Sequence, residues 1–189
     1  MSILSFDNGT NRQHNVASAY ATRSDFQRIF TEDMESLHLL ALLLTADAAT
    51  AEQVFVAGLE ESVHGNPVFK EWARSWSKRV IIRNAVKLLA PFPSALEDSP
   101  APTCASDAAS EKDAWTVAIM QLPAFERFAF VILVLEGHSE SDCASLLGCG
   151  MREMIRARSR ALARIAAEHE DDRLSDHVQS NAIQQSRFA

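Results

Sequence analysis

Residues 137–165 read GHSESDCASLLGCGMREMIRARSRALARI, and this stretch decides the fold. Ser139 is a residue type that caps helix N-termini, and Gly148 stands where the end of a helix favours positive φ. The apolar residues between them recur at a spacing that places them on one helical face: Cys143, Ala144, Leu146 and Leu147. We therefore expect a short helix, a tight Cys149-Gly150 turn and a longer helix, which is the form of a helix-turn-helix.

The longer helix, residues 151–165, is strongly basic. It carries five arginines against the single acid Glu153, a local net charge of +4: Arg152, Arg156, Arg158, Arg160 and Arg164. Arginine suits the phosphate backbone and bonds bidentately to guanine edges, so this pattern favours a nucleic-acid partner. Its expected apolar stripe consists of Met151, Met154, Ile155, Leu162 and Ile165. The alternative is a solvated basic helix in an ordinary bundle, because arginine and alanine are good helix formers.

Composition predicts an all-α protein. The chain has 189 residues, 47% of them hydrophobic, but only six glycines and one tyrosine. Strand-like alternation of convincing length and internal repeats are both missing from the sequence. We expect two small helical domains joined by a flexible linker.

The chain has a net charge of −7, yet its cations are concentrated. Residues 67–90 hold six cations against Glu71, a local net charge of +5. Screening limits the reach of each charge to about 10 Å at physiological salt, so local distribution matters more than the total. Two basic segments in an acidic chain therefore remain compatible with DNA.

The chain divides into five predicted segments. A polar, disordered leader spans 1–21, a helical domain 22–90, a proline-rich linker 91–110, the helix-turn-helix domain 111–167, and an acidic polar tail 168–189. Within 22–90 we expect one helix from an N-cap at Ser24 to Leu44 and a second opening with the capping-box pair Thr50 and Gln53. A third is expected from Pro67 to about Ala90, with its tryptophans mostly in the core or stacking on bases at an exposed edge.

Other function classes find little support in the sequence. Cys104, Cys143 and Cys149 form no CxxC pair, and His138 with two cysteines lacks a fourth ligand, so we expect no metal and no cofactor. Neither a phosphate-binding glycine loop nor a recognisable nucleophile is present, so we expect no enzyme. The apolar run Leu37–Leu44 is too short to cross a bilayer, which predicts a cytoplasmic protein without membrane insertion.

The layout resembles the extracytoplasmic-function sigma factors of bacterial RNA polymerase. The similarity is most specific in residues 122–162, LPAFERFAFVILVLEGHSESDCASLLGCGMREMIRARSRAL, which look like region four of that family. A weaker likeness to region two runs through Leu39-Ala41-Leu44-Thr45 with Asp47, Ala51-Glu52, Phe69, Trp72 and Lys78-Arg79. Together the two parts span roughly residues 24–90 and 111–166.

The resemblance implies a transcription initiation protein that binds core RNA polymerase and promoter DNA. The recognition helix, 151–165, would read the minus-thirty-five element through Arg152, Glu153, Arg156 and Ser159, with Arg158 and Arg160 nearer phosphates. The basic helix, 67–90, would meet the minus-ten element through Lys70, Arg74, Lys78, Arg79 and Arg83. Glu52, Gln53 and Val56 would fall in the polymerase-binding helix, and an anti-sigma factor is a further candidate partner.

The chain departs from the family pattern at both ends of the match. In the region-two part, the chain continues after Ala51-Glu52 through Gln53, Phe55, Val56 and Ala57, where the family has more polar residues. In the region-four part, Ala157 stands where the family commonly has arginine. The turn before it is Cys149-Gly150, where the family often has proline. A second hypothesis is therefore a degenerate sigma-like interaction module, which binds an anti-sigma or signalling partner without promoter activity. An exposed apolar face at Val54, Phe55, Val56 and Leu59 would favour that second hypothesis.

Overall fold

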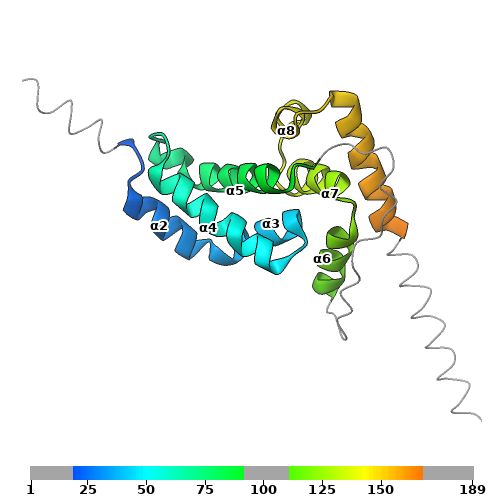
Figure 1. The fold of residues 1–189 in the computed structure, drawn as a ribbon, viewed down its shortest axis with the longest axis horizontal. Helices are drawn as coiled ribbons and strands as arrows, with labels where there is room; N and C mark the ends of the chain where they lie inside the picture. The colour runs from blue at the N-terminus through cyan, green and yellow to red at the C-terminus, as the bar shows by residue number, and fades with distance from the viewer. Residues whose placement is uncertain (1–18, 92–110, 168–189) are drawn as a thin grey trace, which may run out of the picture. The chain divides into compact units, whose positions relative to one another are not determined.

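The computed structural model describes residues 19–91 and 111–167, and within these ranges the fold is all-α as predicted (Figure 1). Outside the helices and turns, Tyr20 and Phe69 form an isolated antiparallel β-bridge. The described residues divide into two compact units. One holds residues up to Leu42 together with Ala48–Leu88, and the other holds Leu43–Asp47 and residues from Leu89 onward. Nearly all of the predicted leader, linker and tail lies outside the described residues.

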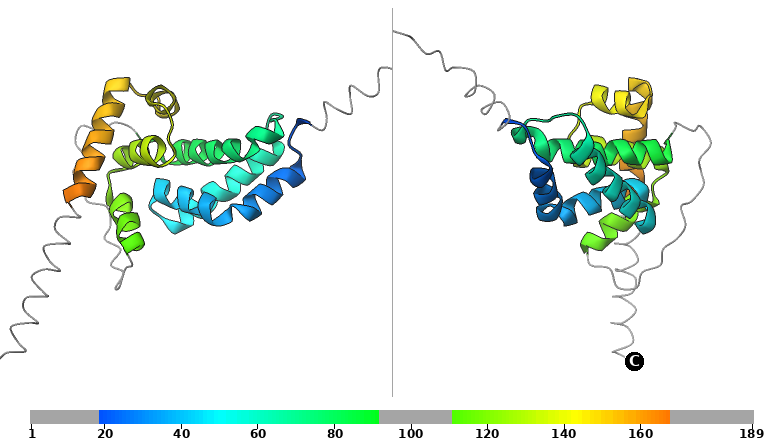
Figure 2. Two further views of the ribbon diagram at one scale, coloured as in Figure 1. Left: turned by 180° about the vertical axis from the view of Figure 1, so that it is seen from behind. Right: turned by 60° about the vertical axis from the view of Figure 1, so that its left-hand side comes forward.

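The first unit is built on helices α2 (Arg23–Glu32), α3 (Met34–Thr45), α4 (Ala48–His64) and α5 (Ala73–Leu89), with a 3-10 turn, η1 (Lys70–Trp72), before α5. Helix α2 lies beside α4 in all the views (Figures 1 and 2). Helix α5 approaches α4 closely at Gly58, where a Cβ would stand 2.6 Å from Cδ1 of Ile81. Glycine at this position therefore allows the two helices to pack.

Four details of this unit differ from the sequence prediction. Helix α2 begins after an N-cap at Thr22, not Ser24, because Thr22 and Asp25 form a reciprocal capping box. The predicted first helix is interrupted at Asp33. Helix α4 starts at Ala48, ahead of the predicted capping pair. Residues 67–69 are not helical, so Phe69 and Trp72 precede α5 and are exposed.

The core of the first unit consists of apolar side chains from every helix. One cluster joins Phe26 and Ile29 of α2 to Val68 and Ala73 at the start of α5, with Trp76 packed against it. Farther along α5, Val80, Ile81 and Ile82 are fully buried. Burying apolar side chains of this size contributes roughly 1.5–3 kcal/mol each, so packing rather than helix propensity holds these helices together.

The second unit ends in the predicted helix-turn-helix. Its helices are α6 (Glu111–Gln121), α7 (Ala124–Phe130), a π-helical turn η2 (Val131–Leu135), α8 (Glu140–Leu147) and a last helix at 151–167. Pro123 separates α6 from α7 as expected, because its ring fixes an extended backbone at the N-cap. Phe125, Phe128, Val131 and Ile132 fill the core. Of the helices described, none is long and apolar enough to span a membrane.

Candidate nucleic-acid interface

Helix α8 and its turn have the caps that the sequence predicted. The hydroxyl of Ser139 accepts a hydrogen bond from the N–H of Asp142 at 3.1 Å. Gly148 is left-handed with φ 64°, and the N–H of Cys149 donates to the carbonyl of Ala144 at 3.0 Å. These contacts end α8 at the C-cap Gly148, and the next helix begins three residues later, at residue 151.

The two helices of the helix-turn-helix pack against each other through a contact between two sulfur atoms. Sγ of Cys143 lies 3.4 Å from Sδ of Met154, and both side chains are fully buried. Burial raises the pKa of the Cys143 thiol to about 12, so it stays protonated at neutral pH. The described residues contain no group of three or more His, Cys, Asp or Glu side chains placed to hold a metal ion. Cys143 therefore acts as a small apolar core residue.

The 151–167 helix packs through a different stripe from the predicted one. Its buried residues are Met154, Ala157, Ala161 and Ile165, a spacing of three and four residues. The predicted stripe was wrong at three positions, since Met151, Ile155 and Leu162 are 43%, 38% and 46% exposed. The small residues Ala157 and Ala161 are fully buried, so they lie on the core side of the helix.

The five arginines of this helix divide into two groups. Arg152 and Arg156 are exposed and form no ion pair with any described residue. Arg158 pairs with Glu140 of α8 at 2.8 Å. The Nε atoms of Arg160 and Arg164 both face the carboxylate of Glu126 on α7. Among the residues that the structure describes, two arginines thus face solvent without a partner, and three pair with acids of the same unit.

Two other residues predicted to face the DNA groove, Glu153 and Ser159, form hydrogen bonds to backbone atoms of nearby residues. The carboxylate of Glu153 accepts from the N–H of Gly150 at 2.8 Å, which caps the start of the helix. The Ser159 hydroxyl donates to the carbonyl of Ile155 at 3.0 Å. Both side chains are exposed, so each remains reachable from solvent, but each would have to exchange an internal hydrogen bond to bind a base.

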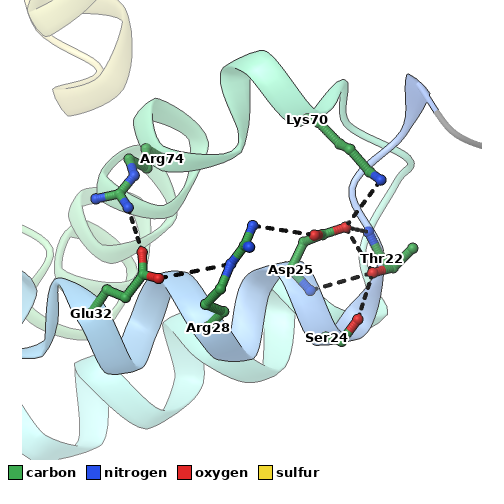
Figure 3. A network of polar contacts seen from close by, with 7 residues as sticks. All are labelled: Thr22, Ser24, Asp25, Arg28, Glu32, Lys70 and Arg74. Carbon is green, nitrogen blue, oxygen red and sulfur yellow. Dashed lines mark hydrogen bonds and ion pairs between the residues drawn. The ribbon is translucent and has the colours of Figure 1, made fainter.

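In the first unit, acids of α2 and of the residue after it neutralise part of the basic segment 67–90 (Figure 3). Lys70 lies 3.8 Å from Asp25, and Arg74 pairs with Glu32 at 2.6 Å and also with Asp33. The pKa of the Asp25 carboxyl is lowered, chiefly by the hydrogen bond from the Thr22 backbone. These two cations therefore lie on the predicted surface but are already partnered.

The rest of the basic segment is mixed. Arg83 is half-buried, pairs with Glu61 and lies 5.2 Å from the centre of the Trp76 ring. Lys78 is half-buried, whereas Arg79 is exposed and makes no ion pair with a described residue. Of the predicted minus-ten residues, Arg79 is thus the cation most directly available to a phosphate.

The predicted polymerase-binding residues share one exposed side of α4. Glu52, Gln53 and Val56 line a shallow hollow of about 500 Å³. Val56 is 47% exposed, whereas Val54 is buried and Phe55 packs edge-to-face on Phe30 with the ring centres 5.3 Å apart. The apolar run of α4 is therefore mostly core, with Val56 as its exposed member.

Sequence reasoning missed the role of Glu126 and Arg127, two buried charges in α7. Arg127 donates through Nη1 to the carbonyls of Met120 and Leu122, and burial lowers its pKa to about 10, so it keeps its charge. The signal was visible as an adjacent acid and base inside the apolar run AFERFAFVIL, because charges in such a run require partners.

Comparison with known proteins finds similarity among solved structures. No family model and no curated protein matches the sequence. Among solved structures, the chain is similar to the sigma factor RpoE from Bartonella quintana, solved in complex with the anti-sigma factor NepR. The two share 19% sequence identity, over 77% of this chain and 97% of RpoE, with a TM-score of 0.46.

Proposed function

We propose that this protein is a sigma factor-like transcription initiation protein that binds core RNA polymerase and recognises promoter DNA. The observation that carries the proposal is a capped helix-turn-helix whose second helix exposes Arg152 and Arg156, neither of which pairs with a described residue. The region-four pattern between Leu122 and Ala161 supports it independently.

In this proposal the 151–165 segment reads the minus-thirty-five element. Arg152 and Arg156 are one turn apart, a spacing that lets both guanidinium groups enter one major groove. Guanidinium groups bond to guanine, and an exposed apolar side chain such as Ile155 contacts the methyl group of thymine. The positive end of the helix also favours nearby phosphate.

The minus-ten element would meet the 67–90 segment. Arg79 can contact a phosphate without first breaking an ion pair to a described residue. The ion pairs of Lys70 and Arg74 are exposed, so replacing them with contacts to phosphate costs little. Trp72, 58% exposed, offers an aromatic face on which an unstacked base can lie. Strand opening of this kind needs no bond chemistry from the protein.

Core RNA polymerase would contact the exposed side of α4. Glu52 and Gln53 supply polar groups there, and Val56, 47% exposed, adds an apolar contact. An interface with so little exposed apolar surface would depend strongly on Val56.

A second candidate is the degenerate sigma-like interaction module without promoter activity. The observation that favours it is the apolar seam of the last helix, in which Met151, Ile155 and Leu162 are exposed beside the arginines. Such a seam suits a protein helix at least as well as a DNA groove. An anti-sigma factor would be a partner of this kind.

Two measurements separate the candidates. Co-elution of the full chain with bacterial core RNA polymerase at low salt, together with run-off transcription from templates selected by the complex, supports the sigma proposal. Binding to polymerase without any transcript, or failure to co-elute, supports the interaction module. Val56→Glu is the matched variant, because it places a charge in the α4 hollow while Val54 and the core stay unchanged.

A further inference from the structure

Glu126 is a buried carboxylate that faces the DNA-binding helix from α7. It is 5% exposed and lies among buried aromatic side chains of its own helix, including Phe125 and Phe128. One carboxylate oxygen, Oε1, accepts a hydrogen bond from Nε of Arg160. The other, Oε2, is 3.1 Å from Nε of Arg164 and accepts no hydrogen bond.

This arrangement restrains the last helix. A buried carboxylate is costly unless paired, so Glu126 favours the position in which both arginines reach it. Arg160 and Arg164 are one turn apart, and a register shift of one residue would rotate both by about 100° away from the carboxylate. The same rotation would move Arg156, one turn before Arg160, off its solvent-facing direction.

We propose that Glu126 is a positioning residue for DNA recognition, which uses Arg160 and Arg164 to set the rotation of the 151–167 helix. Arg160 and Arg164 therefore support the helix instead of contacting phosphate. The consequence for DNA rests on the proposed function, whereas the coupling between Glu126 and Arg160 does not.

The proposal predicts that Glu126→Gln changes DNA affinity in the direction opposite to the one expected from the loss of a negative charge alone. Removing a negative charge near a DNA surface raises affinity for phosphate in general. If Glu126 positions the helix, Glu126→Gln instead lowers affinity for the preferred sequence. Glu140→Gln is the matched control, because it removes the same charge and also faces an arginine of this helix, Arg158, but from a more exposed site.

The DNA arm uses the full chain with core RNA polymerase. The probes are a duplex enriched from a random-sequence pool by the wild-type protein and a mixed-sequence duplex. We expect Glu126→Gln to weaken binding to the enriched duplex by about tenfold, comparable to the loss of one base contact, and to leave binding to the mixed-sequence duplex unchanged or slightly tighter. Equal or tighter binding to the enriched duplex, or an equal loss in Glu140→Gln, overturns the proposal.

The folding arm uses urea unfolding of the wild type, Glu126→Gln, Arg160→Ala and the double variant. We expect the two changes to be strongly non-additive, with the double variant no less stable than Glu126→Gln alone. Additive effects overturn the proposal. If the wild type enriches no sequence, the proposed function fails, while the urea cycle still decides whether Glu126 and Arg160 act as a pair.

Discussion

Replacing Arg152 and Arg156 together with alanine should change how DNA binding depends on salt. Both side chains are exposed and unpaired within the described part of the chain, so each is free to displace counterions from DNA. Each phosphate contact contributes about 0.9 to the slope of log affinity against log salt, so the double variant should have a slope shallower by about 1.8. Between about 50 and 200 mM salt, the wild type should therefore lose about 12-fold more affinity than the double variant.

The assay is fluorescence anisotropy of a labelled duplex at several salt concentrations. Arg158→Ala is the control, since it removes one positive charge from the same helix, but that charge pairs with Glu140 at 2.8 Å. We expect its slope to stay within error of the wild type. If Arg158→Ala flattens the slope by half as much as the Arg152/Arg156 double variant, the division into paired and unpaired arginines is refuted. An unchanged slope in the Arg152/Arg156 variant refutes the assignment of this helix to DNA.

Other predictions test the fold around the site. Met154→Ala should cost about 2–5 kcal/mol in urea unfolding because Met154 is fully buried, whereas the exposed Met151→Ala should cost less than about 0.5 kcal/mol. Gly148→Ala should lower the free energy of unfolding by about 1 kcal/mol, because φ there is 64°; an unchanged midpoint would refute the left-handed cap. Thr22→Ala should cost about 1 kcal/mol through the lost cap. The folded-state pKa of Asp25 is lowered from 3.8, so its stabilisation is present above that pH and disappears as the pH falls through the lower folded value. Thr22→Ala removes the hydrogen bond from the Thr22 hydroxyl to Asp25 but keeps the one from the Thr22 backbone N–H, so it should reduce that acid dependence only in part, and a dependence identical to wild type would contradict the assignment.

The helix-turn-helix could be predicted because its signals are local. Ser139 caps α8, Gly148 adopts positive φ, and Cys143 is buried, all as their sequence positions indicated. Each of these depends on residues only a few positions away. At Ser24 a competing local signal decided the cap, because the neighbouring Thr22 is the residue that forms the capping box with Asp25.

The buried face of the last helix could not be predicted as well. Met151, Ile155 and Leu162 are larger and more apolar than Ala157 and Ala161, so hydrophobicity alone selected the wrong rotation. The observed rotation buries Ala157 and Ala161 and brings two arginines, Arg160 and Arg164, to Glu126. Those are long-range contacts, from residue 126 to residues 160 and 164, which helical spacing does not encode.

Local net charge from the sequence overstates the cationic surface that DNA would meet. The +4 of residues 151–165 includes Arg158, Arg160 and Arg164, which face the acids Glu140 and Glu126. The +5 of residues 67–90 likewise includes cations that face acids of the first unit, among them Asp25, Glu32, Asp33 and Glu61. Counterion release counts only cations that are free to meet phosphate.

Few free cations imply that, on the proposed function, the chain alone would bind DNA weakly. The arginines of the two basic segments that are exposed and unpaired among the described residues are Arg79, Arg152 and Arg156, so the phosphate contribution would correspond to a salt slope of about −3. So few phosphate contacts would hold the chain on DNA only briefly unless another surface also contributes to binding. Joining the two units to core polymerase would supply that surface, because linked sites bind with a high effective concentration. If the proposed function holds, a chain with these paired charges would recognise a promoter mainly as part of a complex, and the exposed side of α4 with Val56 would be as necessary to DNA binding as the arginines.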